Sequence, residues 1–475
     1  MTVDLVKEGM TARAADSIAL LPIEGEFETW LKGQPAATQT WVKSTGFTGK
    51  AGSHCLLPGP AGGLDRVIAG VDWSAGPWSI AGLRGKLPAG RYHIDAELDA
   101  AQATDAALGW CLAGYRFDSY RAQERSEAVL VWPKAADRAA VARDAAAIAL
   151  VRDLVNTPAG DMGPAELAAA ARTLARAHGA KVSVIVGDTL LRKNYPMVHA
   201  VGRASSRAPR LIDLRWGRTG PRVTLVGKGV CFDSGGLDLK PAAGMKLMKK
   251  DMGGSAHVLG LASMIMAAKL PVRLRVLIPA VENSVSGNAF RPLDVIKTRK
   301  GLTVEVGNTD AEGRLILCDA LTEADREKPD LLIDFATLTG AARVAVGTEL
   351  PALFCSDDAL AESFAKAGDK AHDPVWRLPL HAPYRNLLDS KVADLNNISE
   401  GGYGGAITAA LFLAEFVRPQ TPWAHFDIMA WNVRDRPGRP VGGEAMGLRA
   451  SFGVVEALLE KSRKPARKAK GRKTR

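Results

Sequence analysis

Continuous apolar segments recur through the second half of this 475-residue chain and restrict its fold more than any other feature. Four of them are long and apolar enough to be fully buried strands, at residues 223–227, 275–281, 331–336 and 424–428. Segments with apolar residues at helical spacing lie between them, notably at 256–268 and 315–327. Strands and helices that alternate in this way predict an α/β domain with a largely parallel central sheet. Functional residues are therefore expected in the loops beyond the carboxyl ends of these strands.

The first part of the chain has a different pattern, with short strand-like segments separated by glycine and proline. One helix is predicted there, at 105–115, and no group of residues indicates chemistry. An Ala- and Arg-rich stretch follows and predicts a long helix that connects two domains. We therefore expect an N-terminal domain at 1–135, a linker helix at 136–156, a second α/β domain at 157–460 and a basic tail at 461–475.

The net charge of +11 is concentrated at the C-terminal end. The last 15 residues contain nine Lys or Arg and no acid, so residues 1–460 carry only +2. We expect a tail of this composition to be disordered and to add solubility. The alternative is that the tail attracts nucleic acid or another acidic surface.

The cysteines and the hydropathy pattern indicate a compartment. The five cysteines are widely spaced and form no Cys-x-x-Cys pair, which favours buried thiols in a reducing cytoplasm. No apolar run reaches the roughly 18 residues that a membrane span needs. The N-terminus also lacks the basic and apolar segments of a secretory signal. We therefore expect a cytoplasmic protein with no membrane partner.

Residues 308–315, Asn-Thr-Asp-Ala-Glu-Gly-Arg-Leu, carry the most specific chemical signal. Asp310, Glu312 and Arg314 occupy every second position, and such side chains share one face only on an extended chain. The pattern predicts that this segment is extended or forms a loop at a strand end, and that a helix begins near Leu315. Two carboxylates and a guanidinium on one face can hold a divalent metal and an anion side by side. The alternative is an ordinary solvated polar turn.

Two glycine-flanked loops upstream carry further charged residues. Lys228 follows the predicted strand at 223–227, Asp233 and Lys240 come next, and Asp251 lies in Lys-Asp-Met-Gly-Gly. Glycines on both sides of these residues let the backbone approach a ligand closely. The strand ends thus bring three charged loops toward one place.

The four acids of these loops, Asp233, Asp251, Asp310 and Glu312, would repel one another strongly without cations. Two divalent ions would neutralise them, and ligation by oxygen suits Zn, Mn or Mg. The chain has no His-Glu-x-x-His motif, which excludes the common zinc-protease helix. The pattern favours a two-metal hydrolase, and the alternative is a set of surface acids and structural salt bridges.

Residues 308–315 resemble the signature of the leucyl aminopeptidase (cytosol aminopeptidase) family. The loops at 226–240 and 248–254 are similar to that family as well, with the same spacing between charged positions. The resemblance covers residues 150–460 and is weak over 1–135. It implies a small N-terminal α/β domain of the macro-domain type, an α/β catalytic domain, and a homo-hexamer that removes N-terminal amino acids from peptides.

The resemblance also implies a role for each charged residue. The ligands of one divalent ion, Mn or Zn, would be Lys228, Asp233, Asp251 and Glu312. The ligands of the other would be Asp233, Glu312, and Asp310 through its side chain and carbonyl. Lys240 would lie beside the scissile carbonyl, and Arg314 would bind a bicarbonate that acts as general base. Because a lysine ligand must be deprotonated, the alternative is that Lys228 merely pairs with Asp233.

The family pattern places Met248, Thr337 and Gly340 around the first side chain of the substrate, with Met429 as a further candidate. A methionine wall suits apolar side chains, so we expect cleavage after N-terminal Leu and similar residues of peptide substrates. An alternative from another class is a nucleic-acid-binding or regulatory protein that uses the basic tail.

Overall fold

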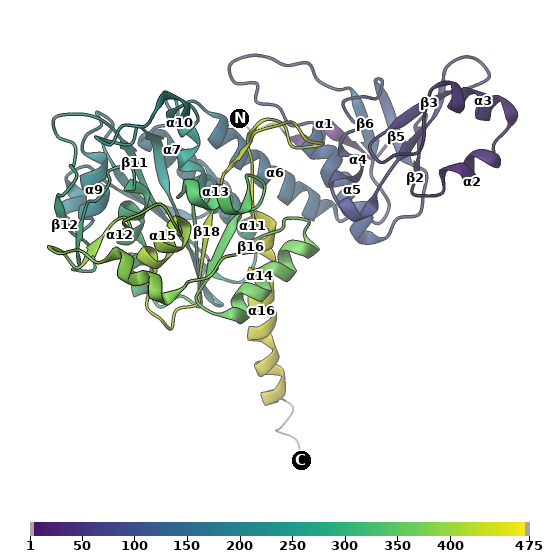
Figure 1. Cartoon of the computed structure of the whole chain (residues 1–475). Coiled ribbons are helices and arrows are strands. Elements are labelled where there is room, and N and C mark those ends of the chain that lie inside the picture. Colours follow the sequence, from purple (N-terminus) through teal and green to yellow (C-terminus); the bar gives the residue numbers. More distant parts are fainter. Residues whose placement is uncertain (1–3, 471–475) are drawn as a thin grey trace. The chain divides into compact units, whose positions relative to one another are not determined.

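The structure is a computed structural model that describes residues 4–470, with side chains described for residues 4–462. The chain forms two compact units (Figure 1), Met1–Ala149 with Arg434–Val441, and Leu150–Val433 with Gly442–Arg475. The division falls within α6 (Arg138–Asn156), which is the long helix predicted at 136–156. Residues 434–441 return to the first unit, a long-range association that the sequence pattern does not indicate.

The first unit contains a six-stranded sheet in the order β1-β6-β5-β2-β4-β3. Neighbouring strands in it are parallel except β3, which pairs antiparallel with β4. The helix predicted at 105–115 begins earlier, as α5 (Ala100–Ala113), because Asp99 caps it by accepting a hydrogen bond from the Gln102 N–H at 2.8 Å. The other elements are β1 (Met10–Thr11), β2 (Ile18–Ile23), β3 (His54–Pro58), β4 (Leu64–Gly70), β5 (Gly90–Ile94), β6 (Ala128–Val131), α1 (Leu5–Gly9), α2 (Phe27–Lys32), α3 (Ala36–Ser44) and α4 (Trp78–Ala81).

The second unit contains a nine-stranded sheet in the order β16-β15-β18-β14-β9-β11-β8-β7, with β10 beside β11. The central strands β18, β14, β9 and β11 are parallel, and antiparallel pairs flank them on both sides. The predicted α/β fold is confirmed, and the four predicted strands are β9, β11, β14 and β18. The strands are β7 (Lys181–Val186), β8 (Arg210–Trp216), β9 (Arg222–Gly227), β10 (Gly229–Asp233), β11 (Arg273–Asn283), β14 (Leu331–Ala336), β15 (Ala352–Cys355), β16 (Trp376–Arg377) and β18 (Trp423–Asp427).

Helices cover both faces of this sheet. On one face α11 (Gly253–Ala267) packs with α7 (Pro164–His178) and α16 (Leu448–Lys470); on the other α12 (Glu312–Arg326) packs with α9 (Pro196–Gly202) and α15 (Gly405–Ala414). Consecutive residues of β9 show the two faces, since Val226 joins the apolar cluster of α12 whereas Gly227 lies against α11. The remaining elements are α8 (Thr189–Arg192), α10 (Ala242–Met245), α13 (Gly340–Val346), α14 (Asp358–Lys370), the 3₁₀ helix η2 (Met248–Met252), and short strands at Val295–Lys297, Thr303–Glu305 and Leu395–Asn396.

Helices α11 and α12 each begin three residues earlier than the sequence predicts. A side chain at Gly254 would lie 2.1 Å from the Phe335 carbonyl oxygen, and one at Gly313 would lie 2.6 Å from Lys228 Cε. Both glycines lie in the first turn of their helix. No larger residue fits at either position, because neighbouring groups approach the backbone too closely. The prediction of an extended segment or loop through Arg314, with a helix from Leu315, is therefore wrong for its last three residues, because α12 starts at Glu312.

The C-terminal helix α16 runs through Lys470, so residues 461–470 are helical where a disordered tail was expected. Residues 471–475 of the predicted tail lie outside the described residues. The five cysteines are buried free thiols, as predicted. Among the described residues, no helix combines the length and apolarity that crossing a membrane requires.

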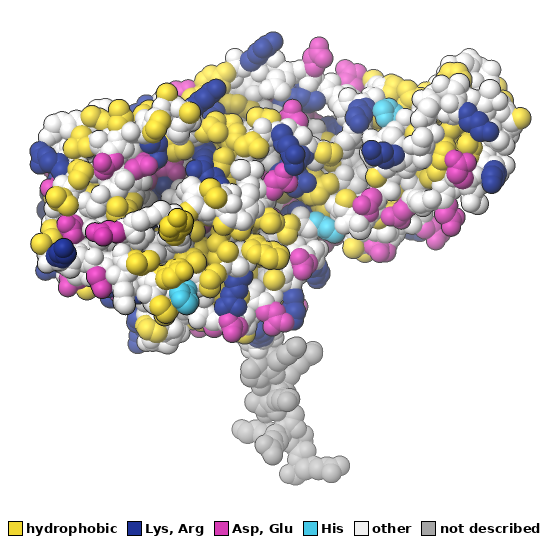
Figure 2. Space-filling model, viewed as in Figure 1, with side chains coloured by type: hydrophobic (Ala, Val, Ile, Leu, Met, Phe, Trp, Pro, Cys, Tyr) yellow, Lys and Arg dark blue, Asp and Glu magenta, His cyan; other side chains and the backbone are white. Residues whose placement is uncertain are grey.

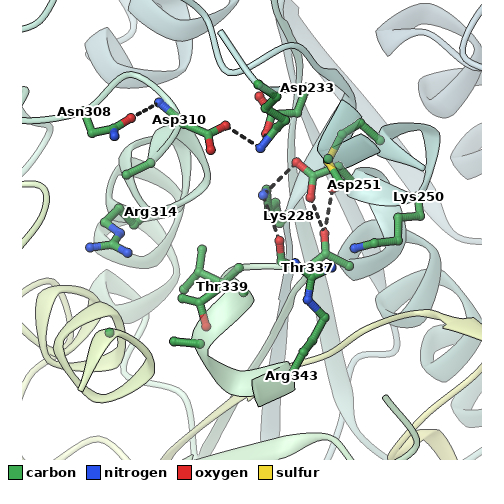
Figure 3. Close-up of a pocket in the computed structure, with 18 of the residues that line it drawn as sticks. Lys228, Asp233, Lys250, Asp251, Asn308, Asp310, Arg314, Thr337, Thr339 and Arg343 are labelled. Carbon is green, nitrogen blue, oxygen red and sulfur yellow. Dashed lines mark hydrogen bonds and ion pairs between the residues drawn. The ribbon is translucent and has the colours of Figure 1, made fainter. Parts of the chain in front are cut away.

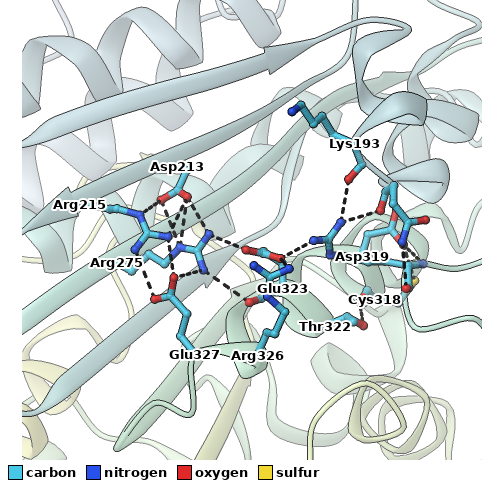
Figure 4. A network of polar contacts seen from close by, with 12 residues as sticks. Lys193, Asp213, Arg215, Arg275, Cys318, Asp319, Thr322, Glu323, Arg326 and Glu327 are labelled. Atoms are coloured by element: carbon cyan, nitrogen blue, oxygen red, sulfur yellow. Dashed lines mark hydrogen bonds and ion pairs between the residues drawn. The ribbon is translucent and has the colours of Figure 1, made fainter.

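A network of arginines and carboxylates joins α12 to β8 and β11 (Figure 4). The Arg275 guanidinium lies 2.7 Å from Asp213, 3.0 Å from Glu323 and 3.1 Å from Glu327. Arg215 lies 2.7 Å from the same Glu327. Each carboxylate of this network therefore has a fixed cationic partner.

Candidate active site

The predicted site residues meet where the central strands end. Lys228 directly follows β9, Asp233 ends β10, and Asp251 lies in η2 just before α11. Asp310 precedes α12 and Glu312 is its first residue. Figure 3 shows Lys228, Asp233, Asp251 and Asp310 pointing into one space from different elements. The carboxyl ends of parallel strands produce this convergence.

The Lys228 ammonium lies between two carboxylates. Its Nζ is 2.8 Å from Asp251 Oδ2 and 2.9 Å from Glu312 Oε1, and it donates a hydrogen bond to the Thr337 carbonyl at 3.0 Å. The alternative pairing of Lys228 with Asp233 is therefore wrong. Burial disfavours the charged ammonium, but Asp251 and Glu312 outweigh it and raise the pKa of Lys228.

Lys240 and Asp233 form a second pair. Lys240 Nζ lies 2.8 Å from Asp233 Oδ2 and also contacts Asp310 Oδ1. Asp233 Oδ1 accepts hydrogen bonds from Asn283 Nδ2 and the Gly235 N–H, both at 2.9 Å. Asn283, at the end of β11, is a positioning residue that sequence reasoning missed, because an asparagine at a strand end gives no distinctive signal.

The carboxylates of Asp233, Asp310 and Glu312 have the arrangement of a cation site. One oxygen from each lies within 4.8 Å of the others. Glu312 is 1% exposed, and its Oε2 has no hydrogen-bond partner among the described residues. The pKa of Glu312 is raised to about 8, mainly by burial and secondly by repulsion from Asp233. The pKa of Asp233 is raised to about 6, mainly by burial and secondly by repulsion from Asp251. A buried, unpartnered carboxylate oxygen in an acidic cluster fits a divalent cation.

Arg314 is the third residue of α12 and is 8% exposed. Its Nη1 donates to the Asn397 carbonyl, while its buried Nε has no hydrogen-bond partner among the described residues. Burial lowers the pKa of Arg314 to about 10, which leaves the guanidinium charged at neutral pH. Glu312 and Arg314 thus point in different directions from the first turn, and both still reach the site.

A cavity of about 470 Å³ contains this chemistry. Lys228, Asp233, Lys240, Asp251, Asp310 and Arg314 line it, while Glu312 lies behind Lys228. The three residues predicted to surround the first substrate side chain, Met248, Thr337 and Gly340, line the same cavity. Met429 is not part of the lining, but its sulfur lies 3.5 Å from Arg343 Nη1.

Lys250 and Arg343 also line this cavity and were not predicted. Lys250 is 3% exposed, and burial lowers its pKa to about 8. The sequence gives no signal that separates Lys250 from Lys249, because two adjacent lysines precede Asp251 and only one of them lines the cavity. Arg343 comes from α13, whose place at the cavity depends on long-range packing.

The fold and the site define a metal-dependent hydrolase with its acidic centre at the carboxyl edge of a parallel sheet. Residues 149–451 match the model of the cytosol aminopeptidase family, catalytic domain, and residues 18–133 match that of the M17 aminopeptidase N-terminal domain. The chain therefore belongs to the cytosol aminopeptidase family, and it is a metal-dependent exopeptidase of the aminopeptidase type.

Individual relatives agree with this assignment. A probable cytosol aminopeptidase of Syntrophotalea carbinolica is 38% identical, over 95% of this chain and 93% of the relative. One from Sinorhizobium fredii is 40% identical, over 87% of this chain and 90% of the relative. The crystal structure of the Coxiella burnetii cytosol aminopeptidase is 52% identical with a TM-score of 0.90, covering 95% of this chain and 99% of that chain. The bottromycin maturation enzyme BotP in complex with Mn is 35% identical with a TM-score of 0.84, and the match covers 94% of this chain and 100% of that chain.

Proposed function

We propose that this aminopeptidase holds two divalent ions, Mn or Zn, in the acidic cavity and removes N-terminal Leu and other apolar residues from peptides. The observation that carries the proposal is the buried Glu312, whose Oε2 has no partner among the described residues while three further carboxylates crowd the same place. A structural salt-bridge cluster would leave no buried carboxylate oxygen unpaired, whereas here two lysines are each shared by two carboxylates. The complex of the similar BotP with Mn supports the choice of metal.

In this proposal each ion has its own set of ligands. One set is Lys228, Asp233, Asp251 and Glu312; the other is Asp233, Asp310 and Glu312. Asp233 and Glu312 therefore serve both ions, in agreement with their place in the oxygen cluster. Lys228 must lose its proton to act as a ligand, so metal binding there releases a proton.

When bound, the two ions would activate a water molecule as nucleophile and polarise the scissile carbonyl. The chain's own residues complete the reaction. The Lys240 ammonium, 2.8 Å from Asp233 Oδ2, stands next to the ligand set and can donate to the developing oxyanion. The Arg314 guanidinium, with its free buried Nε, suits a bicarbonate that takes up the proton of the nucleophile.

The wall of the cavity determines which N-terminal side chain of the peptide substrate is accepted. Met248, Thr337 and Gly340 lie beside the metal ligands, so the side chain of an N-terminal residue would reach them while its amine stays near the ions. Met248 is a soft apolar surface that suits Leu and Met. Apolar N-terminal residues are the expected substrates on this ground.

The family suggests a hexamer, and the surface supports that expectation. Figure 2 shows hydrophobic side chains gathered over the catalytic unit. Val344 of α13 is 90% exposed and Tyr403, just before α15, is 91% exposed. Large exposed apolar side chains of this kind suit a subunit interface. A cytoplasmic location agrees with the five free thiols, and the family assignment does not favour the nucleic-acid-binding alternative.

The direct test is a panel of amino-acid anilides assayed after removal of metal by a chelator and addition of Mn, Zn, Co or Mg. Turnover of the Leu substrate that depends on the added metal is the expected result. Activity that survives complete removal of metal, or faster cleavage of N-terminal Asp or Lys than of Leu, would contradict the proposal.

A further inference from the structure

Two cations face the cavity beside the predicted substrate wall. Lys250 lies in η2 between Met248 and Asp251, and Arg343 lies on α13 three residues after Gly340. In Figure 3 both side chains extend toward Thr337. Lys250 is 3% exposed, so its ammonium is removed from bulk water and open only to the cavity.

The carboxylates nearest to these cations are already committed to other donors. Asp251 Oδ1 accepts from Thr337 Oγ1 at 2.7 Å, and its Oδ2 lies 2.8 Å from Lys228 Nζ. Asp427 Oδ1 accepts from the N–H groups of residues 338 and 339, and its Oδ2 accepts from Thr339 Oγ1 at 2.6 Å. Within residues 4–462, neither Lys250 nor Arg343 forms an ion pair with a carboxylate.

The adjacent Lys249 differs from Lys250 in its surroundings. Lys249 Nζ donates to the Asn156 carbonyl at 2.6 Å and lies 5.4 Å from the centre of the Trp431 ring. Lys249 is therefore satisfied outside the cavity, whereas Lys250 is not. A buried cation without a counterion costs folding free energy, and an anion that enters the cavity removes that cost.

We propose that Lys250, together with Arg343, forms a cationic end to the pocket for the first side chain, so that the enzyme removes N-terminal Glu as well as apolar residues. Met248 would contact the methylene groups of Glu, as it contacts an apolar side chain, and the Lys250 ammonium would bind the carboxylate. N-terminal Lys and Arg are repelled by the same two cations. This inference rests on the proposed aminopeptidase function and adds a second class of substrate.

The test compares kcat/KM for Glu, Gln, Leu and Lys anilides with Mn-loaded enzyme. The variants are Lys250→Met and Arg343→Met, with Lys246→Met as a control that removes an equal charge from an exposed position of the same segment. We expect Lys250→Met to lower the Glu-to-Leu ratio of kcat/KM by about tenfold or more, with a smaller decrease for Arg343→Met. Lys246→Met should leave the Glu-to-Leu ratio of kcat/KM unchanged. Lys250→Arg keeps the positive charge and should therefore retain part of the ratio that Lys250→Met loses.

Metal content and circular dichroism of each variant show whether the folded site is intact. The inference is overturned if wild-type enzyme cleaves Leu but not Glu, or if neither Lys250→Met nor Arg343→Met changes the Glu-to-Leu ratio; both cations would then serve only the internal charge balance. Absence of metal-dependent turnover of Leu would instead overturn the proposed function itself, so the two failures are distinguishable.

Discussion

Two buried charge clusters in the catalytic unit differ in how their charges are balanced. In the network around Arg275, carboxylates alternate with guanidinium groups at 2.7 to 3.1 Å (Figure 4). In the cavity cluster (Figure 3) four carboxylates share two lysines. The Oε2 atom of one of them, Glu312, has no partner among the described residues. In the first cluster each carboxylate is held by a guanidinium group, whereas in the second a buried oxygen of Glu312 stays without a partner among the described residues and is open to a metal ion. Charge balance thus separates a structural network from a site for ions.

Breaking the structural network should have the largest effect on stability. Arg275→Met would remove a buried cation that three carboxylates share. Because Arg215 and Arg299 still pair with these carboxylates, we expect a loss of about 1–3 kcal/mol in the free energy of unfolding. The measurement is thermal or urea unfolding, with Arg275→Lys as the control that retains the charge. Metal content and turnover at low temperature should stay at wild-type values. A loss of metal in the folded variant would mean that the two clusters are not independent.

Removing a cation from the cavity should instead affect the reaction. Lys240→Ala is expected to lower kcat by about 10²–10³, the cost of losing one oxyanion donor elsewhere. The fold and the metal content should change little, since Asp233 keeps its hydrogen bonds to Asn283 and Gly235. Steady-state kinetics and elemental analysis of Lys240→Ala and wild type measure the two quantities, kcat and metal content. Near wild-type kcat for Lys240→Ala would remove this lysine from the mechanism.

The cavity cluster should also respond to pH in the metal-free protein. Burial and Asp233 raise the pKa of Glu312 from 4.5 to about 8, so the native state binds more protons than the unfolded state between these values. Stability contributed by this group is therefore lost as pH rises from about 4.5 to 8. We expect chelator-treated Glu312→Gln to melt at a higher temperature than chelator-treated wild type at pH 8, with a smaller difference near pH 5. A difference that does not change with pH would contradict the raised pKa.

The same comparison explains what the sequence could predict. Apolar runs identified β9, β11, β14 and β18, because a buried parallel strand must be apolar on both faces. Glycine-flanked loops led to Lys228, Asp233, Lys240 and Asp251, because close approach to a ligand requires small residues.

What sequence reasoning missed depends on contacts between distant segments. The start of α12 was misplaced because the alternate spacing of Asp310, Glu312 and Arg314 predicted a non-helical segment, whereas in the structure the helix begins at Glu312. Gly313 fits there because it makes room for the Lys228 side chain. Arg343 reaches the cavity only because α13 packs beside it. Lys228 pairs with Asp251 of η2 and with Glu312 at the start of α12, two elements that are distant in the sequence. A local pattern does not contain this information.

The most direct test of the central claim, that the cavity cluster is a site for two divalent ions, is elemental analysis of dialysed protein. Wild type should retain about two ions per chain, as a two-metal site requires. Asp233→Asn and Glu312→Gln each remove a ligand shared by both ions, so the content should fall toward zero, whereas Asp310→Asn should retain about one ion. Circular dichroism should show an intact fold, because the site lies on loops beyond the sheet. Two tightly bound ions in folded Asp233→Asn or Glu312→Gln would contradict the shared ligands, and active wild type without any divalent ion would contradict the whole account.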